Sequence, residues 1–229
     1  MNQRSDIIGF TGSVNLPDDK AITVTHQIEK LLAGADKVYV GCALGVDALV
    51  IDAMLRAGRA TDLEIFTAFG PLRAATYHGN KFYSAPGASG RPLRAISNLS
   101  GVAVAQQAGA TVHWWAGGTA AVPLRGRLAK RSLRVIESLW TAHGALFAFP
   151  VSLPVTPFGP GKFPTCGSGT WSTAAAAVKM GVPVSVLPVV PPLDLPALPA
   201  KNGGEWQFIE VAPAVYAHQW TPKGALGIV

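Results

Sequence analysis

A glycine-rich turn that leads directly into a helix is the part of this sequence best suited to bind an anion. The turn is Cys166-Gly167-Ser168-Gly169-Thr170, a helix is expected at about 171–180, and a buried strand at 182–187. The first N–H groups of a helix have no partner inside it, and the helix dipole favours negative charge there. Glycines let the backbone approach a ligand closely. The segment therefore predicts a phosphate site, with an ordinary capped helix start as the alternative.

Two other segments also have a glycine-rich turn, in each case directly after a short strand. One has a strand at 38–40, the turn Gly41-Cys42-Ala43-Leu44-Gly45-Val46-Asp47 and a helix at 48–57. The other has a strand at 7–10 followed by Thr11-Gly12-Ser13. Because open α/β sheets bind ligands at the carboxyl ends of their strands, the three turns predict one site at one sheet edge. Asp47 either caps the helix amides or accepts a hydrogen bond from a ligand.

The most basic segment, 125–136, is expected to be a helix between strands at 111–115 and 145–149. Arg127, Lys130, Arg131 and Arg134 are three and four residues apart, so they share one helix face. This pattern favours a phosphate-binding helix, with a solvated face as the alternative.

A long segment between strands, 67–93, interleaves basic and aromatic residues. Tyr77 and Tyr83 in this segment are candidates for stacking on bases, with a solvated loop as the alternative.

Composition narrows the class of protein. The chain has 229 residues, of which 49% are apolar and 14% charged, with a net charge of +6. This balance excludes disorder and indicates a compact globular protein. The three strand–turn–helix units predict an α/β fold with a parallel sheet. The positive charge favours nucleic acid, phosphorylated small molecules or membrane surfaces as partners. The six prolines within 182–199 argue against a membrane-spanning helix there, and the N-terminus lacks the apolar stretch of a signal peptide, so we expect a cytoplasmic protein without a membrane partner.

The domain organisation follows the change in composition near residue 190. Residues 1–190 are expected to form the α/β domain, and residues 191–229 a proline-rich segment with an edge strand at 206–211 and a loosely attached tail from 212. Two cysteines are too few for a disulfide framework. Cys42 and Cys166 either fill tight loops or form a regulatory thiol pair.

The order of four segments resembles the SLOG superfamily of Rossmann-like proteins, which includes the DNA-processing protein A (DprA/Smf) family and the LOG nucleotide phosphoribohydrolases. Residues 8–13 resemble the opening strand and turn, 41–47 the DprA-type glycine–alanine–glycine segment, 127–138 the basic helix, and 167–174 the motif S-G-x-x-x-T-A. The resemblance covers about residues 6 to 187 and is closest to the DprA family. It implies an α/β fold with a Rossmann-like parallel sheet and helices on both faces.

Two departures from the LOG pattern bear on activity. Thr173 stands where the LOG motif P-G-G-x-G-T-x-x-E has its glutamate, whereas Arg131 matches the LOG arginine. Val14 replaces an arginine often found after the first glycine. The lost carboxylate argues against phosphoribohydrolase activity unless Asp47 substitutes for it.

The resemblance implies a DprA-like protein that holds single-stranded DNA or a related nucleotide polyanion in DNA processing or recombination. A sensor of a nucleotide-derived signal and a LOG-like phosphoribohydrolase are the alternatives, and a homodimer stays open. No catalytic residue, cofactor or metal is expected. The residues expected to contact phosphate or nucleotide are Gly12, Ser13, Gly41, Cys42, Ala43, Gly45, Asp47, Arg127, Arg131, Gly167, Ser168, Gly169, Thr170 and Thr173.

Overall fold

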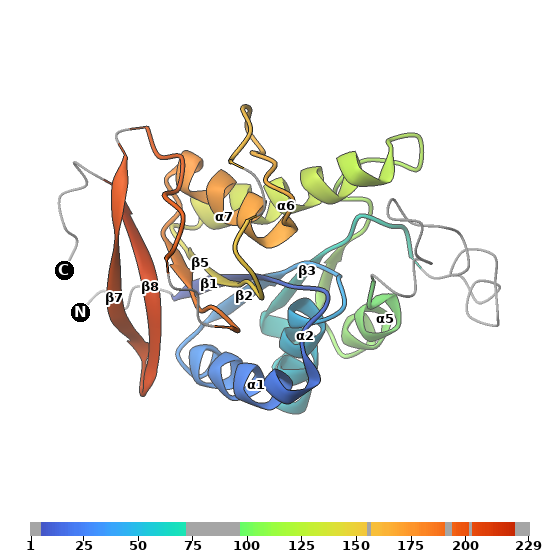
Figure 1. Cartoon of the computed structure of the whole chain (residues 1–229). Coiled ribbons are helices and arrows are strands. Elements are labelled where there is room, and N and C mark those ends of the chain that lie inside the picture. The colour runs from blue at the N-terminus through green and yellow to red at the C-terminus, as the bar shows by residue number, and fades with distance from the viewer. Residues whose placement is uncertain (1–5, 72–96, 155–156, 191–193, 202, 223–229) are drawn as a thin grey trace.

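An open sheet runs through the whole molecule in the computed structural model of the chain, and helices cover both of its faces (Figure 1). The structure describes residues 6–71, 97–154, 157–190, 194–201 and 203–222. Its elements are β1 (Ile7–Gly12), α1 (Asp18–Ala33), β2 (Lys37–Val40), α2 (Val46–Arg56), η1 (Ala60–Asp62), β3 (Leu63–Phe66), α5 (Leu99–Gln107), β4 (Thr111–His113), α6 (Leu124–Thr141), β5 (Ala145–Phe149), α7 (Gly169–Met180), β6 (Val184–Val186), β7 (Gly204–Ala212) and β8 (Val215–Pro222).

The strand order is β4-β3-β2-β1-β5-β6-β8-β7 among the described residues. Strands β1 to β6 are mutually parallel, and β8 and β7 extend the sheet in antiparallel pairing. Strands β1 to β4 are added one after another in one direction, whereas β5 pairs with β1 on its other side, so the strand order reverses between β4 and β5. The expected Rossmann-like α/β fold is confirmed, and a ligand site is expected where the order reverses.

Two packed cores lie on the two faces of the sheet. The lower core in Figure 1 joins the strands to α1, α2 and α5 through side chains such as Ile28, Met54 and Leu99. The upper core joins them to α6 and α7 through Ile136, Leu139 and the fully buried alanines 174–177. Alanine side chains are small, so α7 packs close to the sheet. No helix in the described part of the chain is both long and apolar enough to span a bilayer.

The C-terminal segment differs from the expected loose tail. Residues 215–222 form β8, which pairs with β6 on one side and with the edge strand β7 on the other. Val215 and Ala217 enter the lower core and Trp220 the upper core, where it meets Trp206 edge to face with ring centroids 5.2 Å apart. Sequence periodicity does not identify this strand because its packing depends on a partner strand that is distant in sequence.

The fourth strand is shorter than expected. β4 ends at His113, and Trp115 adopts a positive φ of 56° in the turn that follows. Trp114 and Trp115 therefore lie beyond the strand that was expected to reach residue 115. The Trp115 N–H donates to Phe69 O (3.0 Å), which ties this turn to the segment that follows β3.

A small ion-pair network spans β2, β3 and β4. Glu64 accepts hydrogen bonds from Lys37 Nζ (2.5 Å) and His113 Nε2 (2.9 Å), and the His113 ring stacks on Phe66 at 4.4 Å. Burial by itself would raise the pKa of Glu64, but these two hydrogen bonds outweigh it, so the pKa lies below its ordinary value of 4.5.

We expect the Glu64→Gln variant to melt a few degrees below the native protein at neutral pH. A carboxyl whose pKa is lowered on folding contributes stability above its unfolded pKa and loses it as the pH falls through the folded value. The contribution is about 1 kcal/mol, because Lys37 and His113 are partly exposed to water. Thermal melting of both proteins from pH 7 down to about pH 3 measures this. A gap in melting temperature that stays constant over this range would contradict the assignment.

Candidate functional site at the carboxyl edge of the sheet

Backbone and side-chain contacts bring the three glycine-rich turns to one edge of the sheet. At the end of β1, the Ser13 N–H donates to Phe149 O at the end of β5 (3.2 Å), and Ser13 O accepts from the Val46 N–H at the start of α2 (3.2 Å). In the first turn of α7, Trp171 Nε1 donates to Ser152 O, just beyond β5 (2.7 Å). The ends of β1 and β5 and the starts of α2 and α7 therefore share this edge.

Two glycines allow the first and second turns to touch. A Cβ at Gly12 would overlap the Val46 side chain, and a Cβ at Gly45 would overlap the Ser13 carbonyl oxygen. Gly45 also adopts φ 71° and ψ −127°, a conformation open to glycine but not to residues with a side chain. These glycines serve the contact between turns, and the hydroxyl of Ser13 is engaged in its own turn with Asn15.

A buried carboxylate and an arginine from two different elements face each other at this edge. Asp47 Oδ2 accepts from the Ala43 N–H (3.0 Å) and from Arg131 Nη1 (3.4 Å). The Asp47 side chain is 4% exposed and the Arg131 side chain 12%. Gly41 makes room for this pair, since a Cβ there would overlap the Arg131 guanidinium. Burial raises the pKa of Asp47, and the Arg131 charge and the Ala43 N–H only partly oppose it.

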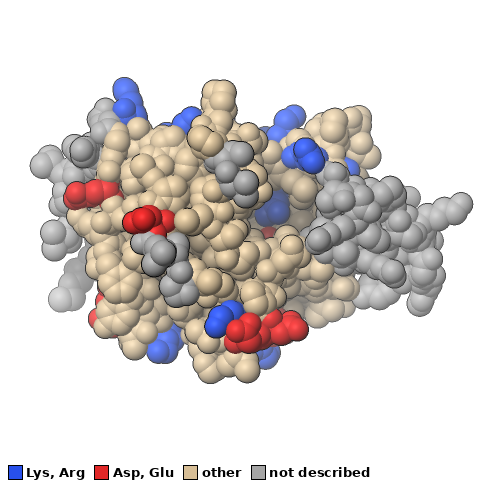
Figure 2. All heavy atoms as spheres, in the orientation of Figure 1, with Lys and Arg blue, Asp and Glu red and all other residues tan. Residues whose placement is uncertain are grey.

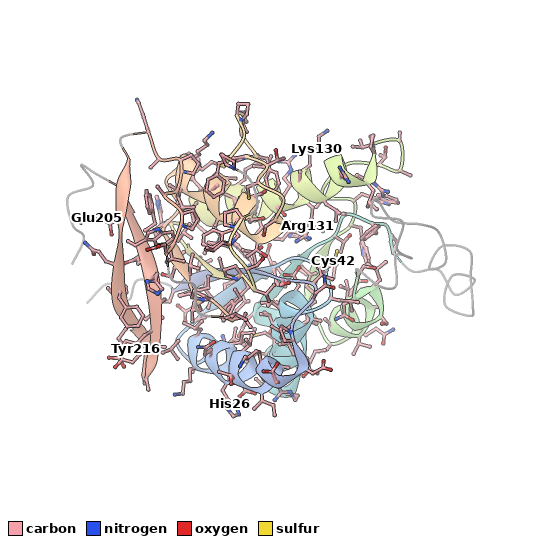
Figure 3. The ribbon with its side chains drawn as sticks, viewed as in Figure 1. His26, Cys42, Lys130, Arg131, Glu205 and Tyr216 are labelled. Atoms are coloured by element: carbon pink, nitrogen blue, oxygen red, sulfur yellow. The ribbon has the colours of Figure 1, made fainter. Side chains whose placement is uncertain are left out.

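Helix α6 directs two of its five basic side chains, Arg127 and Arg131, toward the edge. Arg131 lies on the side of α6 that faces Cys42, whereas Lys130 lies on the outer side (Figure 3). Figure 2 shows a recess in this face of the molecule with basic atoms visible inside it. A guanidinium carries five N–H donors in a fixed fork. Within the described residues, Asp47 is the hydrogen-bond partner of Arg131. The Nε atom of Arg131 is buried and has no hydrogen-bond partner among these residues.

Arg127, one turn before Arg131, has an aromatic environment that the sequence did not reveal. Its Nη1 donates to Ala68 O (3.1 Å), and its guanidinium lies 5.6 Å from the Phe69 ring centroid and 5.4 Å from that of Trp115. Burial lowers the pKa of Arg127 from its ordinary value. The contact with Trp115 depends on the turn after β4, where Trp115 has a positive φ of 56°.

The start of α7 presents an open glycine. Ser168 caps the helix by accepting from the Trp171 N–H (3.4 Å), and Gly167 adopts a positive φ of 77°. A Cβ added at Gly169 would meet no other atom of the described residues within 4 Å. The N–H groups of Gly169 and Thr170 have no acceptor within the helix because they lie in its first turn.

Besides Asp47, three of the expected contact residues have buried side chains, namely Cys42, Thr170 and Thr173. Thr170 and Thr173 are 6% and 3% exposed, and the Thr173 hydroxyl donates to Gly169 O within α7 (2.8 Å). Cys42 lies in the lower core, where burial raises the pKa of its thiol. Cys166 lies in the upper core, and both thiols are free, so the structure contains no bond between them.

Two further points concern the candidate stacking residues and metal binding. Tyr77 and Tyr83 lie outside the described residues. Among the residues that are described, no three His, Cys, Asp or Glu side chains gather as metal ligands do.

Comparison with known proteins places the fold. No family model and no curated protein sequence matches the chain. Among solved structures, DNA processing protein A (DprA) from Streptococcus pneumoniae aligns with a TM-score of 0.51 and 16% identity, over 82% of this chain and 52% of that one. DNA processing protein A from Helicobacter pylori, described for its single-stranded DNA binding mode, aligns with a TM-score of 0.51 and 17% identity, over 84% of this chain and 68% of that one. The chain spans about half the length of the pneumococcal protein, and it has a DprA-like fold.

Proposed function

We propose that this protein binds single-stranded DNA, or a related nucleotide polyanion, at the carboxyl edge of its sheet. The observation that carries the proposal is the pair of arginines one helical turn apart, Arg127 and Arg131, directed at the edge where α2 and α7 begin. Planar guanidinium groups suit phosphate because they offer paired donors in a fixed geometry. The fold it shares with a protein that binds single-stranded DNA supports the same reading.

Each part of the edge has a role in this proposal. The first-turn N–H groups of α7 and the open side of Gly169 receive one phosphate. Arg131, held in place by Asp47, receives another through the donors that Asp47 leaves unused. Asp47 is thus a positioning residue, because it orients Arg131 and accepts a hydrogen bond from the Ala43 N–H. The proposal includes that the protein is a member of the SLOG superfamily and acts in recombination.

A nucleotide phosphoribohydrolase is the second candidate because an acid and an arginine are paired here. The geometry favours binding over hydrolysis, since the Asp47 carboxylate is buried and already holds Ala43 and Arg131. Incubation with nucleoside monophosphates, followed by chromatography, measures release of free base. Turnover that Asp47→Asn abolishes would favour the hydrolase.

The binding proposal is tested by titrating the protein with a labelled single-stranded oligonucleotide at several salt concentrations. We expect saturable binding whose log affinity falls linearly with log salt, with a slope of about −0.7 for each phosphate neutralised. An uncharged oligonucleotide analogue of the same sequence is the control. Equal binding of the two, or binding that ignores salt, would refute the proposal.

A further inference from the structure

The two helical layers carry opposite charge. Residues 114–183, which supply α6 and α7, contain seven Lys or Arg and a single acidic residue, Glu137. Residues 6–71, which supply α1 and α2, contain five Lys or Arg and nine Asp or Glu. Figure 2 shows basic side chains along the upper layer, whereas basic and acidic side chains lie side by side in the lower layer. A polyanion that leaves the sheet edge is therefore attracted over the upper layer and repelled from the lower one.

A hollow of about 550 Å³ opens in the upper layer, between α6, α7 and the segment before α7. Its lining residues are Leu133, Glu137, Gly161, Lys162, Lys179 and Met180. This volume lies within the range of small-molecule sites. The hollow belongs to the middle of α6 and the end of α7, so it is distinct from the site at the start of α7.

The chemistry of the hollow suits one nucleotide unit. Leu133 and Met180 are half-buried and offer an apolar surface to the face of a base. Lys162 and Lys179 are exposed, and an ammonium group carries three donors. Lys179 gives one of these to Gly161 O (3.0 Å), which leaves the others for a phosphate. The Glu137 carboxylate is already neutralised by Arg134 Nη1 (2.8 Å).

Lys130 of α6 adds positive charge between the hollow and the sheet edge, beside the Arg134–Glu137 ion pair. Lys130 and Arg134 are exposed on α6 and lie one turn apart, and Glu137 of the hollow follows on the same stripe. Arg131 follows Lys130 in sequence but lies on the inner side of α6, where it enters the edge site.

We infer that the hollow is a second contact for the same single-stranded polyanion, holding a nucleotide unit beyond the one at Arg131. The inference rests on the proposed function, because it assumes that single-stranded DNA occupies the edge site. It predicts that affinity depends on oligonucleotide length in a way that Lys162 and Lys179 control.

The test compares binding of an oligonucleotide of about 4 nucleotides with one of about 16, by fluorescence anisotropy. We expect the Lys162→Gln/Lys179→Gln variant to bind the long oligonucleotide about tenfold more weakly and to lower its salt slope by about 1.4, with no change for the short one. The matched control, Lys20→Gln/Lys30→Gln in α1, removes the same charge from the opposite layer and is expected to change neither affinity by more than about twofold.

Several outcomes would overturn the inference. An unchanged affinity for the long oligonucleotide, an equal loss in the control variant, or an equal loss for both lengths would each do so. Binding of an acidic peptide to the hollow with no effect on DNA would assign it to a protein partner instead. If the native protein binds neither oligonucleotide, the proposed function itself fails. If the double variant melts early, Lys162→Gln alone, at an exposed lysine, is expected to weaken long-oligonucleotide binding about threefold.

Discussion

Replacement of Arg131 by Gln is expected to weaken binding of single-stranded DNA by between about tenfold and a hundredfold. Hydrogen bonds to charged groups contribute about 1.5–3 kcal/mol each, and Arg131 is the arginine that reaches the junction of α2, α6 and β2. The measurement is an anisotropy titration with a short oligonucleotide at fixed salt. Lys30→Gln is the control, because it removes one positive charge from the exposed end of α1 on the opposite layer.

A second variant separates binding from folding. Arg131→Gln alone leaves the Asp47 carboxylate buried without its cation, which by itself destabilises the protein. Adding Asp47→Asn removes that charge while keeping an oxygen that accepts from the Ala43 N–H. We therefore expect the double variant to recover much of the melting temperature but none of the DNA affinity. Recovery of both would show that Arg131 acts only in the stability of the site.

Replacement of Gly45 by Ala is expected to lower the free energy of unfolding by about 3 kcal/mol. Alanine at this position has two energetic costs. Its backbone would be strained in a conformation that glycine adopts freely, and its Cβ would overlap the Ser13 carbonyl oxygen. In a chain of this size, this corresponds to a fall in melting temperature of about 6–12 °C. DNA affinity is expected to fall as well, because Gly45 sets the start of α2 and hence the place of Asp47.

Gly58→Ala is the matched control for this substitution. Gly58 has nearly the same φ, 67° against 71°, but a Cβ there would meet no described atom within 4 Å. The expected cost is about 1–2 kcal/mol, from the left-handed backbone alone. Equal melting temperatures for the two variants would show that the contact between the first and second turns does not constrain the site.

Up to about residue 190, the sequence alone determined the order of strands, turns and helices, because the signals for these elements are local. Short apolar runs predicted the strands at 38–40 and 145–149, which the structure has as β2 (Lys37–Val40) and β5 (Ala145–Phe149). The helix expected to end at residue 180 does so: α7 ends at Met180, and Gly181 follows with a φ of 81°. The meeting of three turns at one edge followed from the rule for parallel sheets.

Only the tertiary structure decided which side chains face that edge. Arg127, Lys130, Arg131 and Arg134 share a face by spacing, but the packing of Val135, Ile136 and Leu139 fixes the rotation of α6. That rotation turns Arg131 toward Asp47 and leaves Lys130 outside. The aromatic neighbours of Arg127 and the pairing of β8 with β6 join residues far apart in the chain. Such contacts depend on the energy of the whole packed fold, and no local pattern of residues encodes them.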